Sequence, residues 1–285
     1  MSPLKAVLII IIVLGHFVYY MENPVFNLIH KLGTSAVAMF FFISGFGCIR
    51  SYQRKGREYL KGFFRSRILG ILLPAAILLI IHSCWKHQIS MPPQYWFLFV
   101  ILFDYLLFWL CYSFLKPSLR IPALWIGSLL FIVVTILTGF DRCWWICCMA
   151  FPTGCFFSLV ENTLAEVYSE KPLCFIAWMS AGLLLFALTF LTHNPYIWTL
   201  SYVGISWTLA LIVSVIPLDH LELPVLSFLG SISYEIYLSH ITIFEVLQRL
   251  LPDAAPRSFY ILATLLLTIV VAYVVNRLCK MVIKK

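Results

Sequence analysis

The sequence has few charged residues, and this scarcity excludes most classes of protein. Only 11% of its 285 residues are Asp, Glu, Lys or Arg, whereas soluble domains contain about 25%. Hydrophobic residues make up 62%, and the mean hydropathy is +0.96. The apolar stretches are long and continuous instead of alternating, which disfavours a membrane β-barrel. The composition therefore predicts an all-α, polytopic membrane helical bundle.

Several other features are missing as well. No polar segment is long enough for a soluble domain, so we expect residues 1–285 to form a single integral-membrane domain with no appended soluble domain. No internal repeat is visible, which weakens an interpretation as an inverted-repeat transporter. The nine cysteines fit no zinc or haem spacing, and we expect no metal site. The first apolar run lacks a convincing cleavage site, so we interpret it as a retained helix and not as a signal peptide.

Apolar segments of spanning length fill most of the chain. Because a helix needs about 20 apolar residues to cross the hydrocarbon core, we predict about ten transmembrane helices, separated by proline and polar clusters. Their approximate ranges are 4–21, 32–50, 66–84, 96–115, 121–140, 143–160, 172–192, 196–217, 225–248 and 258–280. Among the connections, the predicted loops at 161–171 and 218–224 are acidic.

The basic residues indicate the orientation of these helices. If the N-terminus is cytoplasmic, most of the 20 Lys and Arg residues fall on the cytoplasmic side. The positive-inside rule therefore predicts an N-in, C-in arrangement. The same rule accounts for the net charge of +8, so this charge does not call for a nucleic-acid partner.

The first apolar segment carries two ionisable residues at a helical spacing. Lys5 and His16 are eleven residues apart, so on an α-helix they share one face at a separation of about 16 Å. The cation then lies at the membrane surface and the imidazole lies near the bilayer centre. Because an ionisable side chain is expensive there, His16 is a candidate functional residue. The alternative is a His that only hydrogen-bonds a neighbouring helix.

A second polar stripe lies in the ninth segment. Ser233, Tyr237 and His240 recur at helical spacing on an otherwise apolar helix. Glu235 lies near the predicted bilayer midplane, and Asp104 is a similar carboxylate in the fourth segment. An unpaired carboxylate at this depth is costly, so each should be protonated, paired or wetted by a cavity. Both are candidates to face His16.

Basic residues also gather between the second and third segments. Arg65 and Arg67 lie at the start of the third helix, where they could bind phosphate groups of a ligand or anionic lipid headgroups. In the second segment, Phe-Phe-Phe-Ile-Ser-Gly-Phe at 40–46 places Ser44 beside Gly45. Such a small pair suits close helix packing, and the Ser44 hydroxyl could alternatively serve a polar interior.

Taken in order, these motifs resemble the acyltransferase-3 family of integral-membrane O-acyltransferases that modify bacterial glycans. The family pattern is matched by a first-helix cation and histidine, a Ser-Gly-Phe element, an Arg-rich stretch before a proline, a Trp-led helix and a late Ser-Tyr-x-x-Tyr-Leu-x-His motif. The matching residues are Lys5 and His16, 41–46, Arg65, Arg67 and Pro74, 96–98, and 233–240. The chain departs from the pattern with Lys5 in place of Arg, and with Gly70 where a second Arg is usual.

The resemblance implies a bacterial inner-membrane enzyme. It would transfer an acyl group, most often acetyl, from cytosolic acyl-CoA to a hydroxyl of a cell-envelope or extracellular carbohydrate or lipid-linked glycan. His16 would be the general base or a transient acyl carrier, oriented by Glu235 or Asp104. Lys5, Arg65 and Arg67 would bind the phosphates of acetyl-CoA. Ser44, Tyr237 and His240 would contact the acceptor.

Two other functions remain open from the residues alone. A secondary transporter or lipid-linked glycan flippase could use the midplane carboxylates as a proton relay. Such a protein should have broken helices in two related halves, which the sequence does not display. A non-catalytic membrane scaffold is the third possibility, and a midplane His and Glu without partners would favour it.

Overall fold

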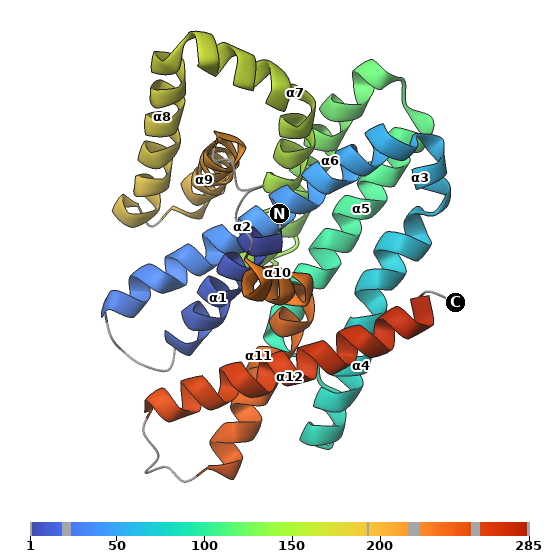
Figure 1. Cartoon of the computed structure of the whole chain (residues 1–285), viewed down its shortest axis with the longest axis vertical. Coiled ribbons are helices and arrows are strands. Elements are labelled where there is room, and N and C mark those ends of the chain that lie inside the picture. The colour runs from blue at the N-terminus through green and yellow to red at the C-terminus, as the bar shows by residue number, and fades with distance from the viewer. Residues whose placement is uncertain (1, 19–23, 193, 216–222, 252–256, 284–285) are drawn as a thin grey trace. The chain divides into compact units, whose positions relative to one another are not determined.

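A computed structural model describes residues 2–18, 24–192, 194–215, 223–251 and 257–283 (Figure 1). These residues form twelve α-helices, one π-helical turn and two 3₁₀ turns, and they contain no strand. Within these described ranges, seven helical stretches are long and apolar enough to cross a membrane. The prediction of an all-α, multi-pass membrane bundle is therefore confirmed. The number of crossings and the N-in, C-in orientation stay predictions.

The helices follow the predicted segments in order, although the second begins at Pro24 instead of 32 and the sixth long helix begins at Ala150 instead of 143. The long helices at the predicted positions are α1 (Ser2–Val18), α2 (Pro24–Lys55), α4 (Leu69–Lys86), α5 (Trp96–Phe114), α6 (Pro117–Leu137), α7 (Ala150–Glu170), α8 (Pro172–Leu191), α9 (Pro195–Val215), α11 (Ser233–Leu250) and α12 (Arg257–Ile283). Two short helices, α3 (Arg57–Lys61) and α10 (Pro224–Ser231), complete the set in the described ranges.

Two further predictions about these elements are wrong. The segment 225–248 is not one helix, because the chain leaves helical geometry at Ile232 (φ −117°, ψ 13°) and α11 begins at the next residue. This break puts Glu235 in the first turn of α11, where the helix dipole favours a negative charge. The predicted loop at 161–171 is instead the end of α7, which continues to Glu170. Most of the predicted loop at 218–224 lies outside the described residues.

The chain divides into two compact units. Unit 1 comprises residues 1–33, 63–98 and 223–285, and unit 2 comprises residues 34–62 and 99–222. In unit 1, α11 packs against α12 and α4, and α1 contacts α10 and α11 (Figure 1). In unit 2, α7, α8 and α9 contact one another, and α6 contacts α7. The expectation of a single membrane domain stays a prediction.

A glycine allows α10 to pack closely against the start of α1. A Cβ atom built on Gly230 would collide with the backbone carbonyl of Ser2. Any larger residue at this position would therefore require the backbone of α1 to move. This close approach within unit 1 helps to hold the first turn of α1, which includes Lys5.

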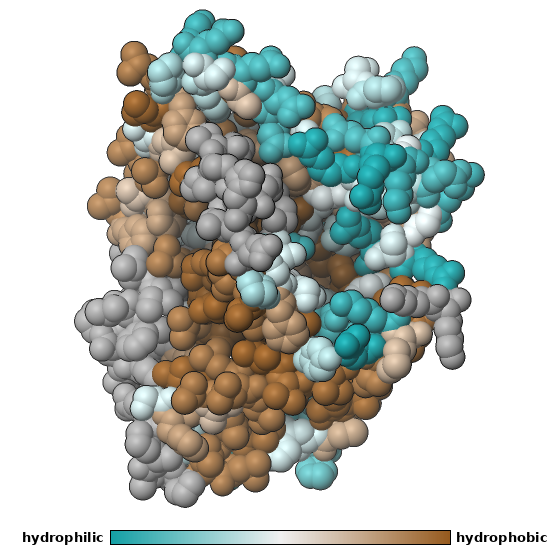
Figure 2. Space-filling view, viewed as in Figure 1, coloured by the Kyte–Doolittle hydropathy of each residue, from teal (hydrophilic) through white to brown (hydrophobic). Residues whose placement is uncertain are grey.

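The outer face of α12 is apolar. Leu262, Leu266 and Val270 are 57%, 58% and 57% exposed, and Figure 2 shows a largely apolar surface over the region of this helix. Exposed apolar faces of this extent mark a surface that meets an apolar partner, which for a multi-pass bundle is the lipid. Asn276 of the same helix, in contrast, is buried.

Candidate active site

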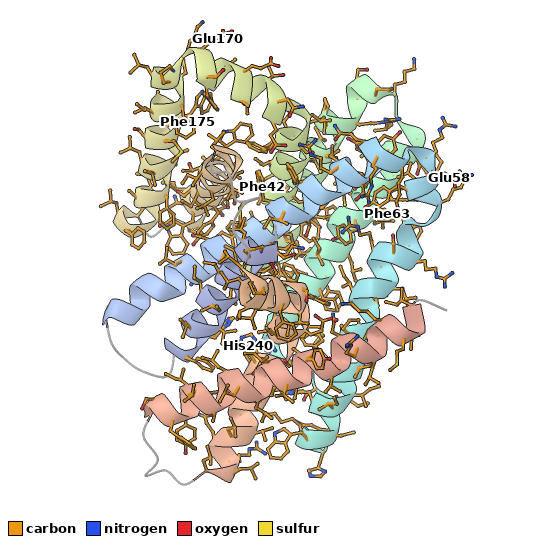
Figure 3. All side chains as sticks on the ribbon, viewed as in Figure 1. Phe42, Glu58, Phe63, Glu170, Phe175 and His240 are labelled. Carbon is orange, nitrogen blue, oxygen red and sulfur yellow. The ribbon has the colours of Figure 1, made fainter. Side chains whose placement is uncertain are left out.

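Two histidines from opposite ends of the chain meet inside unit 1. Nδ1 of His16, near the end of α1, lies 2.9 Å from Nε2 of His240, in the middle of α11. Their ring centroids are 4.9 Å apart. His240 is fully buried, whereas His16 is partly exposed (Figure 3 labels His240). We expected a carboxylate beside His16, and the structure places a second histidine there.

The backbone of α11 determines which nitrogen of His240 carries a proton. Nδ1 of His240 lies 3.1 Å from the carbonyl oxygen of Ile236, one turn earlier. Because a carbonyl oxygen can only accept, Nδ1 must donate, and in the neutral ring Nε2 is then an acceptor. His16 therefore donates through Nδ1, so its lone pair is on Nε2. In that tautomer Nε2 has the lone pair that a general base or a nucleophile requires.

The turn of α11 that carries His240 is held by a residue outside the predicted set. The Tyr237 hydroxyl donates to the carbonyl oxygen of Gln94 (2.9 Å), and Nε2 of Gln94 donates to the carbonyl oxygen of Leu238 (3.0 Å). The ring centroids of Tyr237 and His240 are 6.0 Å apart. Tyr237 thus adjoins the histidine pair, as its motif suggested. Gln94 was missed because a Gln after two prolines is typical of an ordinary loop.

Glu235 is paired with a polar residue of α12. Nδ2 of Asn276 donates to Oε1 of Glu235 at 2.7 Å, and the Lys280 ammonium also acts on this carboxylate. Glu235 is only 5% exposed, so this pairing meets the requirement that a buried carboxylate has partners. Asn276 was also missed, although a lone Asn in an apolar final helix was a visible signal. That Glu235 orients His16 stays a prediction.

Lys5 and Arg67 come together at the start of α1. Lys5 is half-buried, and the Arg67 guanidinium is close enough for the two positive charges to repel each other. Arg67 lies in the π-helical turn Phe64–Ile68, which precedes α4. Such turns re-aim side chains and are frequent at functional sites. Two interacting cations, both partly buried, form an environment that favours a bound anion.

Arg65 is directed differently, although it belongs to the same π-helical turn. Its side chain is exposed, and its guanidinium lies 3.4 Å from the carbonyl oxygen of Ile283, near the end of α12. The three predicted phosphate ligands are therefore not equivalent. Lys5 and Arg67 are adjacent, whereas Arg65 is at the surface beside the last turn of α12.

Ser44 belongs to unit 2. Its hydroxyl donates to the carbonyl oxygen of Phe40 in its own helix at 2.8 Å. A Cβ atom built on the neighbouring Gly45 would collide with the carbonyl oxygen of Phe151 in α7. These contacts favour the packing interpretation of the Ser-Gly pair. The contact of Ser44 with an acceptor stays a prediction.

Asp104, the other predicted carboxylate, is also in unit 2. It lies on α5 and is fully buried, and neither of its carboxylate oxygens has a hydrogen-bond partner among the described residues. The thiols of Cys148 and Cys155 lie near enough to interact with it electrostatically. Within the described ranges, no group of three or more His, Cys, Asp or Glu side chains is arranged to hold a metal ion.

Comparison with known proteins reveals a match over nearly the whole chain. The family model described as an acyltransferase domain, that of acyltransferase 3, matches residues 4–277. This range includes the histidine pair, the Lys5–Arg67 pair and the Glu235–Asn276 pair. Neither a search of curated proteins nor one of solved structures finds a match.

Proposed function

Because this chain belongs to the acyltransferase 3 family of membrane acyltransferases, we propose that it is an O-acyltransferase of a bacterial inner membrane. It transfers an acyl group, in the first instance acetyl from acetyl-CoA, to a hydroxyl of a cell-envelope or extracellular carbohydrate. The observation that carries the proposal is the 2.9 Å contact between His16 and His240. It supplies an imidazole with the protonation that a general base requires, inside a largely apolar bundle.

The donor binds at the cytoplasmic end of unit 1. Lys5 and Arg67 hold the phosphates of CoA, with the guanidinium able to make two parallel hydrogen bonds to one phosphate. Arg65, at the surface, adds attraction for the approaching polyanion. Lys5 and His16 share one face of α1 and are about 16 Å apart. The flexible arm of CoA extends along this face and brings the thioester to His16.

The chemistry uses one lone pair. Nε2 of His16 removes the proton from the acceptor hydroxyl, and the hydroxyl oxygen bonds to the carbonyl carbon of the thioester. The carbon–sulfur bond breaks, and the departing CoA thiolate takes the proton from His16. His240 accepts the Nδ1 hydrogen bond throughout, a role that a carboxylate has in the serine hydrolase triad. In an alternative order, the same lone pair attacks the thioester and His16 carries the acyl group transiently.

This proposal includes the predicted topology. The seven apolar spans, together with α1, α7 and α11, would make ten crossings. With a cytoplasmic N-terminus, Lys5 and Arg67 face the cytosolic pool of CoA. His16 then lies between this pool and the acceptor on the other side.

The test is turnover of radiolabelled acetyl-CoA by the purified protein in lipid nanodiscs, with His16→Ala beside the wild type. We expect His16→Ala to lower turnover by about 10²- to 10⁴-fold, the usual contribution of a general base. CoA binding, measured by calorimetry, should persist in the variant. A variant that loses CoA binding to the same extent would mean that His16 is structural. A folded wild-type protein that does not bind CoA would contradict the proposed function.

A further inference from the structure

One atom beside the histidine pair lacks the partner that its burial demands. Gln94 lies in the 3₁₀ turn Pro93–Tyr95 before α5 and is 2% exposed. Its Nε2 and its backbone carbonyl are engaged by Leu238 and Tyr237. Its Oε1, in contrast, has no hydrogen-bond partner within the described part of the chain. Leaving such a group unsatisfied costs about 1–3 kcal/mol.

The orientation of this amide is determined by its surroundings. If the amide were flipped, Oε1 would face the carbonyl oxygen of Leu238, and two acceptors would repel each other. Oε1 therefore points away from Leu238, and as an acceptor it can be satisfied only by an O–H or N–H donor. A ligand hydroxyl is such a donor.

Other polar groups farther along α11 are paired with α4. Nδ1 of His82 lies 3.0 Å from the hydroxyl of Thr242, and Lys86 forms a 2.6 Å ion pair with Glu245. Gln94 Oε1 differs from these paired groups. Among the described residues, Trp85 Nε1 in the last turn of α4 and Ser90 Oγ in the connection after it are also buried without hydrogen-bond partners. Unsatisfied polar atoms thus gather where the chain passes from α4 to α5.

We propose that Oε1 of Gln94 accepts a hydrogen bond from a second hydroxyl of the acceptor, next to the hydroxyl that His16 deprotonates. This inference rests on the proposed function. Leu238 and Tyr237, which hold Gln94, lie within one turn of His240 on α11. Gln94 and His16 therefore contact the same part of α11, and an acceptor with several hydroxyls has a donor for each of them. The site therefore selects polyhydroxylated acceptors over simple alcohols, because an alcohol with one hydroxyl leaves Oε1 unpaired.

The test measures binding without acetyl-CoA. Methyl glycosides of glucose, galactose and mannose, and tetrahydropyran-2-methanol as an alcohol with one hydroxyl, are titrated onto protein in nanodiscs by saturation-transfer NMR. The proteins are the wild type, Gln94→Met, which keeps the shape of the side chain, and Gln88→Met, a matched control at an exposed glutamine of the same connection. CoA binding and the thermal midpoint report whether each variant is folded.

We expect at least one glycoside to bind the wild type and Gln88→Met at least tenfold more tightly than Gln94→Met. The alcohol should bind all three alike. In the wild type alone, monodeoxy analogues of the bound glycoside should identify one hydroxyl whose removal weakens binding about tenfold, even if Gln94→Met fails to fold. The inference is overturned if the wild type binds no glycoside, if every deoxy analogue binds as the parent does, or if folded Gln94→Met binds like the wild type. None of these results depends on acyl transfer, so failure of the turnover test is read separately.

Discussion

Both units bury a carboxylate on a long apolar helix, but they treat it in opposite ways. In unit 1, Glu235 accepts a hydrogen bond from Asn276 and lies in the first turn of α11. In unit 2, Asp104 is fully buried on α5, and among the described residues neither oxygen has a partner. An unpaired buried polar group weakens the fold, whereas a paired one helps to hold two helices together.

The buried hydroxyl and imidazole groups of the two units also differ in where their hydrogen-bond partners lie. In unit 1, polar side chains join different helices, as His16–His240 and His82–Thr242 do. In unit 2, the buried hydroxyls of Ser206 and Thr208 donate to carbonyl groups of their own helix. Close glycine packing occurs in both units, at Gly154 against Phe42 in unit 2 and at Gly230 against Ser2 in unit 1. Unit 2 also joins helices through polar groups, but its ion pair Arg50–Glu161 is partly exposed, whereas the histidine pair of unit 1 includes a fully buried His240.

After His16→Ala, the largest loss of activity should come from substitution of His240, which also belongs to unit 1. His240→Phe removes the acceptor of the His16 Nδ1 hydrogen bond, so the imidazole loses its tautomer and orientation. We expect kcat to fall about 10²-fold, as for a misplaced catalytic group, with an unchanged KM for acetyl-CoA. His240→Gln, whose side-chain oxygen can accept the same bond, should restore part of kcat. Equal losses in both variants would point to a packing role.

Substitution of the cations of unit 1 should have the next largest effect, on CoA binding. Lys5→Met or Arg67→Met removes a charge that binds CoA phosphate, and each should raise the Kd for CoA roughly 10- to 100-fold, since hydrogen bonds to charged groups contribute about 1.5–3 kcal/mol. Arg65→Met is the matched control from the same π-helical turn. Because Arg65 is exposed, its loss should change the Kd by about threefold or less. Calorimetric titration of CoA measures all three, and a larger effect at Arg65 would reverse our assignment of the donor site.

The carboxylate pair of unit 1 should govern stability. Asn276→Leu leaves the Glu235 carboxylate buried without its donor, so we expect the free energy of unfolding to fall by about 1–3 kcal/mol. The double variant Asn276→Leu with Glu235→Leu should recover most of that loss, because both polar groups are then absent. Thermal unfolding in nanodiscs measures the difference. If the single and double variants unfold alike, the pair does not stabilise unit 1.

Substitution of Asp104 in unit 2 should give the smallest change in stability, and this change should be a gain instead of a loss. Asp104→Val removes a buried group that lacks a partner, so the thermal midpoint should stay the same or rise, corresponding to about 1 kcal/mol. Asp104→Asn, nearly identical in shape and still polar, is the control and should resemble the wild type. A fall in stability for the Val variant would show that Asp104 has partners after all. Lost turnover in a more stable variant would support the prediction that Asp104 takes part in catalysis.

Most of the fold could be predicted because a membrane helix is specified by the hydropathy of its own residues. Runs of apolar residues and their proline boundaries located the long helices, although α2 begins at Pro24 instead of 32 and α7 begins at Ala150 instead of 143. Two of the errors have physical causes. The break at 229–233 follows Gly230 and Ser231, a pair that is common at helix kinks, and it coincides with the close contact of Gly230 and α1. The acidic end of α7 was interpreted as a loop from its charge, although Glu, Ala and Leu are good helix formers.

The site was predictable to the extent that it is periodic. The spacing of Lys5 and His16 on one helix, and of Tyr237 and His240 on another, follows from 3.6 residues per turn. Gln94 and Asn276 were missed because their importance depends on which helix each one faces. Asp104 and Glu235 were equivalent in the sequence, and they differ only in the partners that surround them.

The sequence by itself determined that this protein is a multi-pass helical bundle and which ionisable residues lie inside apolar helices, because hydropathy and helical period are local. Only the tertiary structure decided that His16 meets His240 across 224 residues of chain and that Arg67, not Arg65, adjoins Lys5. It also decided which nitrogen of His16 holds the lone pair, through a carbonyl oxygen on another helix. Such choices depend on the packing of α1 against α11 and on one π-helical turn, and no local rule specifies either.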